Sequence, residues 1–197
     1  MKIGIDIDGV LTDEHSFIID YASKYLNERN IPYTVHKDIY DSEKVFDVSK
    51  EVWREFWKEH IFYYSKNVQA RPFASDVINK LKNENIEIFI ITARYYTTYE
   101  NEHTKEMQRI VKEWLNNSNI PYDNIIFSEE KLETCKKYEI DLMIEDKPEN
   151  VLSISNKIPV ICYDHLYNAK LNNKNIIRCY SWYEIYKKIN ELKNGSN

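Results

Sequence analysis

The sequence predicts an α/β protein whose doubly wound, mostly parallel sheet carries a small helical insertion after the first strand. Three observations predict this fold. Continuous apolar runs alternate with amphipathic helical patterns, polar residues follow nearly every run, and a long interval of helical character separates the first run from the second. The alternation of strands and helices implies right-handed crossovers between parallel strands.

Six short segments rich in Ile, Val and Phe are bounded by turn residues and show no apolar–polar alternation. Unbroken apolar strands of this length are typical of a sheet that is buried on both faces. We therefore expect strands at residues 3–7, 86–92, 124–128, 141–144, 159–163 and 175–180.

Amphipathic helices are expected between the later strands. Residues 73–81 and 105–115 each place their apolar side chains on one side of a helix, with Val77, Ile78 and Leu81 in the first and Met107, Ile110, Val111, Trp114 and Leu115 in the second. Ligands of a doubly wound sheet bind beyond the carboxyl ends of its strands. We therefore expect the functional residues at these strand ends.

The interval between the first two strands is far longer than one crossover helix needs. Two amphipathic helices are predicted inside it, at about residues 15–28 and 49–64. They form either two extra helices packed on the core or a cap over the active site. We favour the cap because the insertion directly follows the strongest motif, and we assign residues 14–71 to it and residues 1–13 and 72–197 to the core domain.

Composition excludes several classes of partner. A net charge of −5 argues against a nucleic-acid polymer, which needs a concentrated basic face. No stretch approaches the roughly 20 apolar residues of a membrane span, and no apolar run near the N-terminus suggests a secretory signal. We expect a cytoplasmic protein without a membrane partner, and a homodimer remains open.

Cys135, Cys162 and Cys179 are widely spaced, so neither a disulfide framework nor a zinc site is expected. Cys162 and Cys179 lie in apolar runs, which are typical of core positions.

Two aspartates end the first predicted strand. Asp6 and Asp8 lie two residues apart and point the same way if extended geometry persists, and Gly9 permits a tight departure of the backbone. Two adjacent like charges are costly unless a cation neutralises them. Oxygen ligands of this kind suit Mg²⁺ beside a phosphate. An Asp-rich turn without function is the alternative.

Further polar groups follow two of the later strands. Thr92 and Ala93, followed by Arg94, offer a hydroxyl and backbone amides that could cradle phosphate oxygens. Glu145 and Asp146 supply two more carboxylates at another strand end. Each signal alone has a structural explanation, such as a capped turn, but their order along the chain is harder to explain that way.

A lysine could balance the phosphate and aspartate charges. Lys131 follows the strand predicted at residues 124–128, whereas Lys136 and Lys137 lie closer in sequence to the acidic pair. All three remain candidates at this point, and the alternative for Lys136 and Lys137 is an ordinary solvated helix face.

These motifs resemble those of haloacid dehalogenase (HAD) superfamily phosphatases, and most of all the 5′(3′)-deoxyribonucleotidase branch and its bacterial nucleotidase relatives. The resemblance covers nearly the whole chain. The run from Asp6 to Leu11 matches the first HAD motif, Thr92 the second and the Glu145–Asp146 pair the fourth. The sheet is similar to the Rossmann-like HAD core and the insertion to a type-1 cap.

The resemblance implies a Mg²⁺-dependent phosphate monoester hydrolase. Asp6 would be the nucleophile that forms an aspartyl-phosphate, and Asp8 would protonate the leaving group and then deprotonate water. The metal would bind Asp6, the backbone carbonyl of Asp8 and Asp146. Close relatives carry Asp where this chain has Glu145, which either acts through a water molecule or alters the metal geometry.

The resemblance also assigns the phosphate site and the substrate. Thr92, the amide of Ala93, Arg94 and Lys131 would hold the phosphoryl group. The resemblance favours Lys131 over Lys136 and Lys137, because family members usually carry the third-motif lysine after a strand. The substrate would be a nucleoside monophosphate, with another small ester such as a sugar phosphate, or a non-catalytic regulatory protein, as alternatives. Aromatic residues of the predicted cap could stack on a base, and Arg71 is a secondary candidate for anion contact; these aromatic residues are Tyr21, Trp53, Phe56, Trp57, Tyr63 and Tyr64.

Overall fold

A six-stranded, fully parallel sheet organises the protein. The computed structural model describes residues 1–195. The strands are β1 (Lys2–Ile5), β2 (Glu87–Thr92), β3 (Asn124–Phe127), β4 (Leu142–Glu145), β5 (Val160–Tyr163) and β6 (Ile176–Cys179), in the spatial order β3-β2-β1-β4-β5-β6. Every neighbouring pair is parallel. All six predicted strands are confirmed to within one or two residues at their ends.

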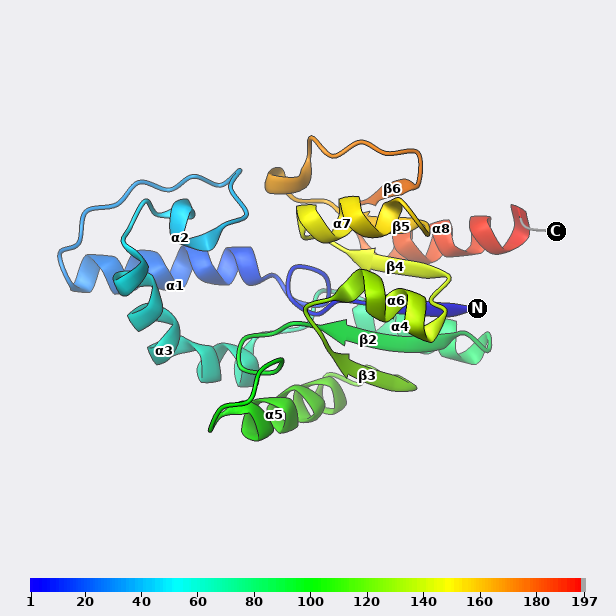
Figure 1. The fold of residues 1–197 in the computed structure, drawn as a ribbon, viewed down its shortest axis with the longest axis horizontal. Coiled ribbons are helices and arrows are strands. Elements are labelled where there is room, and N and C mark those ends of the chain that lie inside the picture. The colour runs from blue at the N-terminus through cyan, green and yellow to red at the C-terminus, as the bar shows by residue number, and fades with distance from the viewer. Residues whose placement is uncertain (196–197) are drawn as a thin grey trace.

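Helices cover both faces of the sheet (Figure 1). One face packs on α4 (Ala74–Asn83), α5 (Thr104–Asn117) and α8 (Trp182–Gly195), and the other on α6 (Lys131–Tyr138) and α7 (Pro148–Ser155). The strands therefore need apolar residues on both sides, which explains their unbroken apolar runs. All three cysteines are buried thiols, as the prediction of core positions for Cys162 and Cys179 required.

The strand order reverses between β1 and β4. β1 is flanked by β2 and β4, so the chain runs outward in opposite directions from this central pair. A crevice beyond the carboxyl ends of the strands forms at such a switch point, because the following segments diverge to the two sides. One predicted acidic pair lies in the loop after β1, and the other lies at the end of β4 and in the first position after it.

The insertion after β1 forms α1 (Glu14–Glu28), α2 (Ser42–Val45) and α3 (Lys50–Asn67). These helices share an apolar cluster of their own and lie beyond one end of the sheet in Figure 1; its buried members are Ile18, Ala22, Tyr25, Leu26, Val45, Phe46, Trp53 and Phe56. The entering and leaving segments are joined where Thr12 pairs with Ala70 in an antiparallel bridge. This arrangement is consistent with a cap, and the domain boundaries at residues 13 and 72 remain a prediction.

No helix within residues 1–195 is long and apolar enough to cross a membrane.

Candidate active site

The loop after β1 turns sharply beneath the pocket. The amide of Asp6 still donates to the Ile144 carbonyl at 3.0 Å, and the amides of Leu11 and Thr12 then converge on the Ile7 carbonyl. Gly9 has a φ of +83°, and a Cβ added there would lie 2.0 Å from Asp146 Oδ2. Only glycine suits both the backbone conformation and this close approach.

Lys131 joins two buried carboxylates. It is the first residue of α6, and its Nζ lies 2.7 Å from Asp6 Oδ2 and 2.7 Å from Glu145 Oε2. Lys136, in contrast, pairs with the exposed Glu133 on the helix surface. The geometry therefore favours Lys131 over the two later lysines as the cation of the site.

Glu145 organises the loop that follows β4. Its Oε1 accepts the backbone N–H groups of Asp146 and Lys147 at 3.1 and 3.0 Å, and its Oε2 accepts from Lys131 and, at 3.4 Å, from Asn150. The residue is fully buried. Both oxygens are thus engaged within the protein, which explains how a glutamate with its longer side chain is accommodated here.

Asp146 presents one oxygen without a partner. Tyr167 donates its hydroxyl hydrogen to Oδ2, while Oδ1 is buried and has no hydrogen bond to any other residue of the described chain. Oxygens of Asp6, Glu145 and Asp146 lie within 4.8 Å of one another. Burial, followed by the negative charge of Glu145, raises the pKa of Asp6 to about 8 and that of Asp146 well above its ordinary value. A buried cluster of three carboxylates, one of which has an oxygen without a hydrogen-bond partner, fits a divalent cation such as Mg²⁺.

Asp8 is held by a cation and a hydroxyl. Arg94 Nε lies 3.1 Å from each Asp8 oxygen, and the Tyr64 hydroxyl donates to Oδ1 at 2.6 Å. Burial alone would raise the pKa of Asp8, but the charge and hydrogen bonds of Arg94, together with Tyr64, lower it. Asp8 is therefore an anion in this arrangement, and the sequence indicated neither partner.

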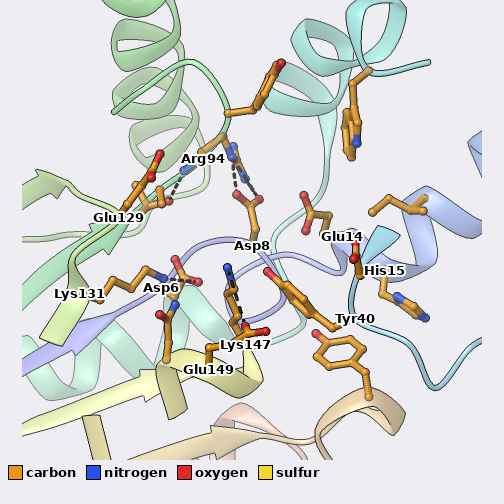
Figure 2. A pocket seen from close by; sticks show the side chains of 18 of the residues that line it. Asp6, Asp8, Glu14, His15, Tyr40, Arg94, Glu129, Lys131, Lys147 and Glu149 are labelled. Carbon is orange, nitrogen blue, oxygen red and sulfur yellow. Dashed lines mark hydrogen bonds and ion pairs between the residues drawn. The ribbon is translucent and has the colours of Figure 1, made fainter. Parts of the chain in front are cut away.

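The end of β2 supplies the opposite wall of the site. Thr92 is buried, and its Oγ1 accepts the backbone N–H of Arg94 at 3.2 Å. Thr92, Ala93 and Arg94 line a pocket of about 570 Å³ together with Asp6 and Asp8. Figure 2 shows Lys131 and Arg94 approaching the two aspartates from different elements, and Lys131 belongs to the same lining. The predicted residues of three loops thus converge on one cavity.

Helices of the insertion close the other side of this pocket. Glu14, His15 and Trp57 belong to its lining, as does Tyr40 from the connection after α1. Among the aromatic residues considered for stacking on a base, only Trp57 lines it within the described chain. Two others, Trp53 and Phe56, lie in the apolar cluster of the insertion.

Some placements differ from what sequence patterns suggest. Arg71 lies outside this pocket, where its guanidinium contacts the carbonyls of Thr12 and Gly9. Tyr64 contacts Asp8 rather than standing free for stacking. Glu14 and Tyr167 carry no motif, and no signal in a single sequence relates them to residues 6 and 146.

Comparison with protein families identifies one match along almost the whole chain. The model of the family described as 5′ nucleotidase, deoxy (Pyrimidine), cytosolic type C protein matches residues 1–194. A nucleotidase of Clostridium acetobutylicum is 31% identical over 197 residues, which cover 98% of this chain and 95% of that protein.

Solved structures share the fold at low sequence identity. A HAD-superfamily hydrolase from Ehrlichia chaffeensis aligns over 97% of this chain and 96% of its own, with a TM-score of 0.56 and 16% identity. A predicted phosphoglycolate phosphatase from Haemophilus somnus aligns over 95% and 96%, with a TM-score of 0.62 and 14% identity. The architecture is therefore that of HAD hydrolases.

Proposed function

The chain belongs to the cytosolic type C 5′-nucleotidase family and is a HAD-type enzyme, and from that premise we propose that it hydrolyses nucleoside monophosphates through an aspartyl-phosphate on Asp6. The nucleotide class of the substrate is supported by the family and by its relative in Clostridium acetobutylicum. The chemistry is supported by the convergence of Asp6, Asp8, Lys131 and Asp146 at the carboxyl ends of the central strands. We also propose that the enzyme acts in the cytoplasm, as the family description implies.

Asp6 is the proposed nucleophile. An oxygen of its carboxylate attacks phosphorus, the bond between phosphorus and the ester oxygen breaks, and the electron pair leaves with the alcohol oxygen. Lys131, 2.7 Å from Asp6 Oδ2, favours the anionic form of Asp6 against the effect of burial and orients the carboxylate. Because Lys131 also binds Glu145, its position is fixed before substrate enters.

Asp8 is the proposed acid and base. In the first step a protonated Asp8 gives its proton to the leaving alcohol oxygen. In the second step its carboxylate takes a proton from the water that attacks phosphorus, and the bond between phosphorus and the Asp6 oxygen breaks, which releases phosphate and restores the Asp6 carboxylate. The carboxylate held by Arg94 corresponds to the form needed for the second step. A substrate phosphate that draws Arg94 away from Asp8 would raise the proton affinity of Asp8 and favour the first step.

The phosphoryl group is held by residues at the end of β2 and by Lys131. Thr92 supplies a hydroxyl, Ala93 a backbone amide and Arg94 a guanidinium, and all three line the pocket beside Asp6. Arg94 Nη1 is buried without a hydrogen-bond acceptor among the described residues, which suits a group that gains a partner from the ligand. Most of the rate enhancement would then come from positioning and charge compensation.

Mg²⁺ is the proposed cofactor. The carboxylates of Asp6 and Asp146 and the backbone carbonyl of Asp8 would hold it, and the unsatisfied Oδ1 of Asp146 is the observation that supports this set. When bound, the ion offsets the charge between the carboxylate and the phosphate. Glu145 would not bind the ion directly, because its oxygens already accept hydrogen bonds from Lys131 and two backbone amides.

The decisive experiment is a phosphate-release screen over nucleoside monophosphates, sugar phosphates and phenyl phosphate, with Mg²⁺ or with a chelator. We expect release from nucleotides that requires Mg²⁺ and disappears in Asp6→Asn and Asp8→Asn. Release from sugar phosphates alone would contradict the nucleotide assignment, and release by Asp6→Asn would contradict the nucleophile. A wild-type protein inactive on every ester would favour a non-catalytic role.

A further inference from the structure

Glu14 is a pocket carboxylate that the proposed mechanism does not use. We infer that Glu14 determines specificity by accepting a hydrogen bond from a donor group, a hydroxyl or an N–H, on the leaving nucleoside. This inference rests on the proposed hydrolysis of phosphate esters. It adds a contact to the part of the substrate that the phosphate-binding residues do not touch.

Glu14 lies where the insertion meets the loop after β1 that carries Asp6 and Asp8, which we call the catalytic loop. It is the first residue of α1 and follows the catalytic loop directly, and it lines the same pocket as Asp6 and Asp8. Figure 2 shows its side chain reaching from the side of the insertion toward Asp8. Glu14 therefore lies on the side of Asp8 that faces the insertion.

The Glu14 carboxylate has no donor within the protein. Across residues 1–195, no side chain or backbone group forms a hydrogen bond or an ion pair with its oxygens. Its electrostatic neighbours include Asp8 and Asp6, and burial together with the charge of Asp8 raises the pKa of Glu14 to about 8, although Arg94 acts in the opposite direction. A carboxylate beside two others, in a pocket for an anionic phosphate, is unfavourable unless a ligand supplies a donor.

Two structural roles for Glu14 explain the geometry less well. An acid in the first turn stabilises a helix, but Asp13 already caps α1 by accepting the Ser16 N–H at 3.2 Å. Glu14 is also absent from the oxygen cluster of Asp6, Glu145 and Asp146, so it does not extend the candidate metal site. Its orientation into the cavity remains to be explained by a ligand.

The leaving group has the chemistry that Glu14 requires. The ester oxygen of the substrate must lie within reach of Asp8 to receive its proton, so the nucleoside begins on that side of the pocket. A nucleoside carries sugar hydroxyls close to this oxygen and N–H donors farther away on its base. A site that binds such donors with a carboxylate rejects esters that lack them, because the carboxylate is then left buried and unpaired.

The test compares wild type with Glu14→Gln. The substrates are phenyl phosphate, which has no donor on its leaving group, and the ribo, 2′-deoxy and 2′,3′-dideoxy forms of the best nucleotide in the phosphate-release screen. We expect Glu14→Gln to lower kcat/KM for the ribonucleotide about tenfold, because the amide oxygen of glutamine still accepts the hydrogen bond but no longer carries the charge that strengthens it. For phenyl phosphate we expect no such loss of kcat/KM, because its leaving group offers Glu14 no donor.

The nucleotide series separates the two kinds of donor. A loss that disappears with the dideoxy form assigns the contact to sugar hydroxyls, and a loss of equal size in all three forms assigns it to the base. Asp20→Asn is the matched control, since it removes the same charge from an exposed position of the same helix. We expect that variant to keep the wild-type ratio of nucleotide to phenyl phosphate activity.

A Glu14→Gln variant that changes all substrates by the same factor, or none, overturns the inference while leaving the proposed function intact. Failure of the proposed function is different, because wild type would then release no phosphate from nucleotides. If sugar phosphates alone are hydrolysed, the best sugar phosphate compared with phenyl phosphate provides the same test of Glu14.

Discussion

The guanidinium of Arg94 lies against the carboxylate of Asp8, with its Nε 3.1 Å from both carboxylate oxygens. The Tyr64 hydroxyl completes this arrangement, since it contacts Asp8 Oδ1 at 2.6 Å and Thr12 Oγ1 at 2.8 Å. Thr12 in turn pairs with Ala70, where the chain leaves the insertion. Asp8 is therefore tied both to the core, through Arg94, and to helix α3 of the insertion, through Tyr64.

Replacing Arg94 with glutamine should destabilise the fold. The Arg94 side chain is only 1% exposed and its partner Asp8 18%, so the variant leaves a largely buried carboxylate without its cation. Loss of one partner of a buried ion pair costs about 3 kcal/mol. We expect a decrease of this size in the unfolding free energy of Arg94→Gln, measured by urea denaturation. The double variant Asp8→Asn/Arg94→Gln should recover part of this loss. Strictly additive effects of the two substitutions would mean that the pair is not coupled.

Lys131→Met should impair both stability and catalysis. The substitution leaves Asp6 and Glu145 buried without the Nζ that lies 2.7 Å from each of them. We expect a loss of about 3 kcal/mol in unfolding free energy and a fall in kcat/KM of about 100-fold or more.

Lys136→Met is the matched control for Lys131. Lys136 lies on the same helix, but its side chain is 47% exposed and pairs with Glu133 at the surface. Exposed pairs contribute between about 0 and 1 kcal/mol, so this variant should remain close to wild type. A large loss of activity in Lys136→Met with none in Lys131→Met would reverse the choice between the two lysines.

The sheet could be predicted from the sequence because its cause is local. A strand buried on both faces must be apolar throughout, and residues 86–92 and 159–163 show this directly. The acidic pairs at residues 6, 8, 145 and 146 could also be predicted to meet, because parallel strands end at the same edge. The motif order then determined which loops form the candidate site.

The remaining site residues depend on tertiary packing. Tyr64 and Trp57 both lie on α3 within an aromatic amphipathic pattern, yet Tyr64 reaches Asp8 while Trp57 lines the pocket. Periodicity alone cannot tell these positions apart, because it shows that a side chain is turned inward and not what it meets. The same limit applies to Tyr167, whose partner Asp146 lies 21 residues away.

Tyr167→Phe should weaken Mg²⁺ binding. The Tyr167 hydroxyl donates to Asp146 Oδ2, which leaves Oδ1 as the unpaired oxygen of the candidate metal site. Loss of a residue that orients a metal ligand typically lowers metal affinity about 10- to 100-fold. Calorimetric titration of Mg²⁺ without substrate should show this decrease.

Tyr183→Phe is the control for this experiment. Its hydroxyl also donates to a carboxylate, that of Asp76, but Tyr183 is exposed and does not line the candidate site. Mg²⁺ affinity should be unchanged in this variant. Equal Mg²⁺ affinities in wild type and Tyr167→Phe would remove Tyr167 from any role at the metal site.

His165 should make stability depend on pH. Burial, together with the nearby charge of Arg71, lowers the pKa of His165 from 6.5 to about 4, although its contact with the Gly9 carbonyl opposes this shift. The unfolded imidazole takes up a proton as the pH falls through about 6.5, whereas the folded one does so only near pH 4. The stabilisation is therefore complete above pH 6.5 and is lost as the pH falls from 6.5 toward 4.

The size of this effect can be isolated with His165→Gln, which retains an N–H donor for Gly9 but does not titrate. Between pH 7.5 and pH 5, wild type should lose about 2 kcal/mol more unfolding free energy than the variant, measured by urea denaturation at each pH. Other groups titrate in the same range, but they do so in both proteins and cancel in the difference. Identical losses in the two proteins would show that the folded His165 takes up a proton as readily as the unfolded imidazole, so that burial does not lower its pKa.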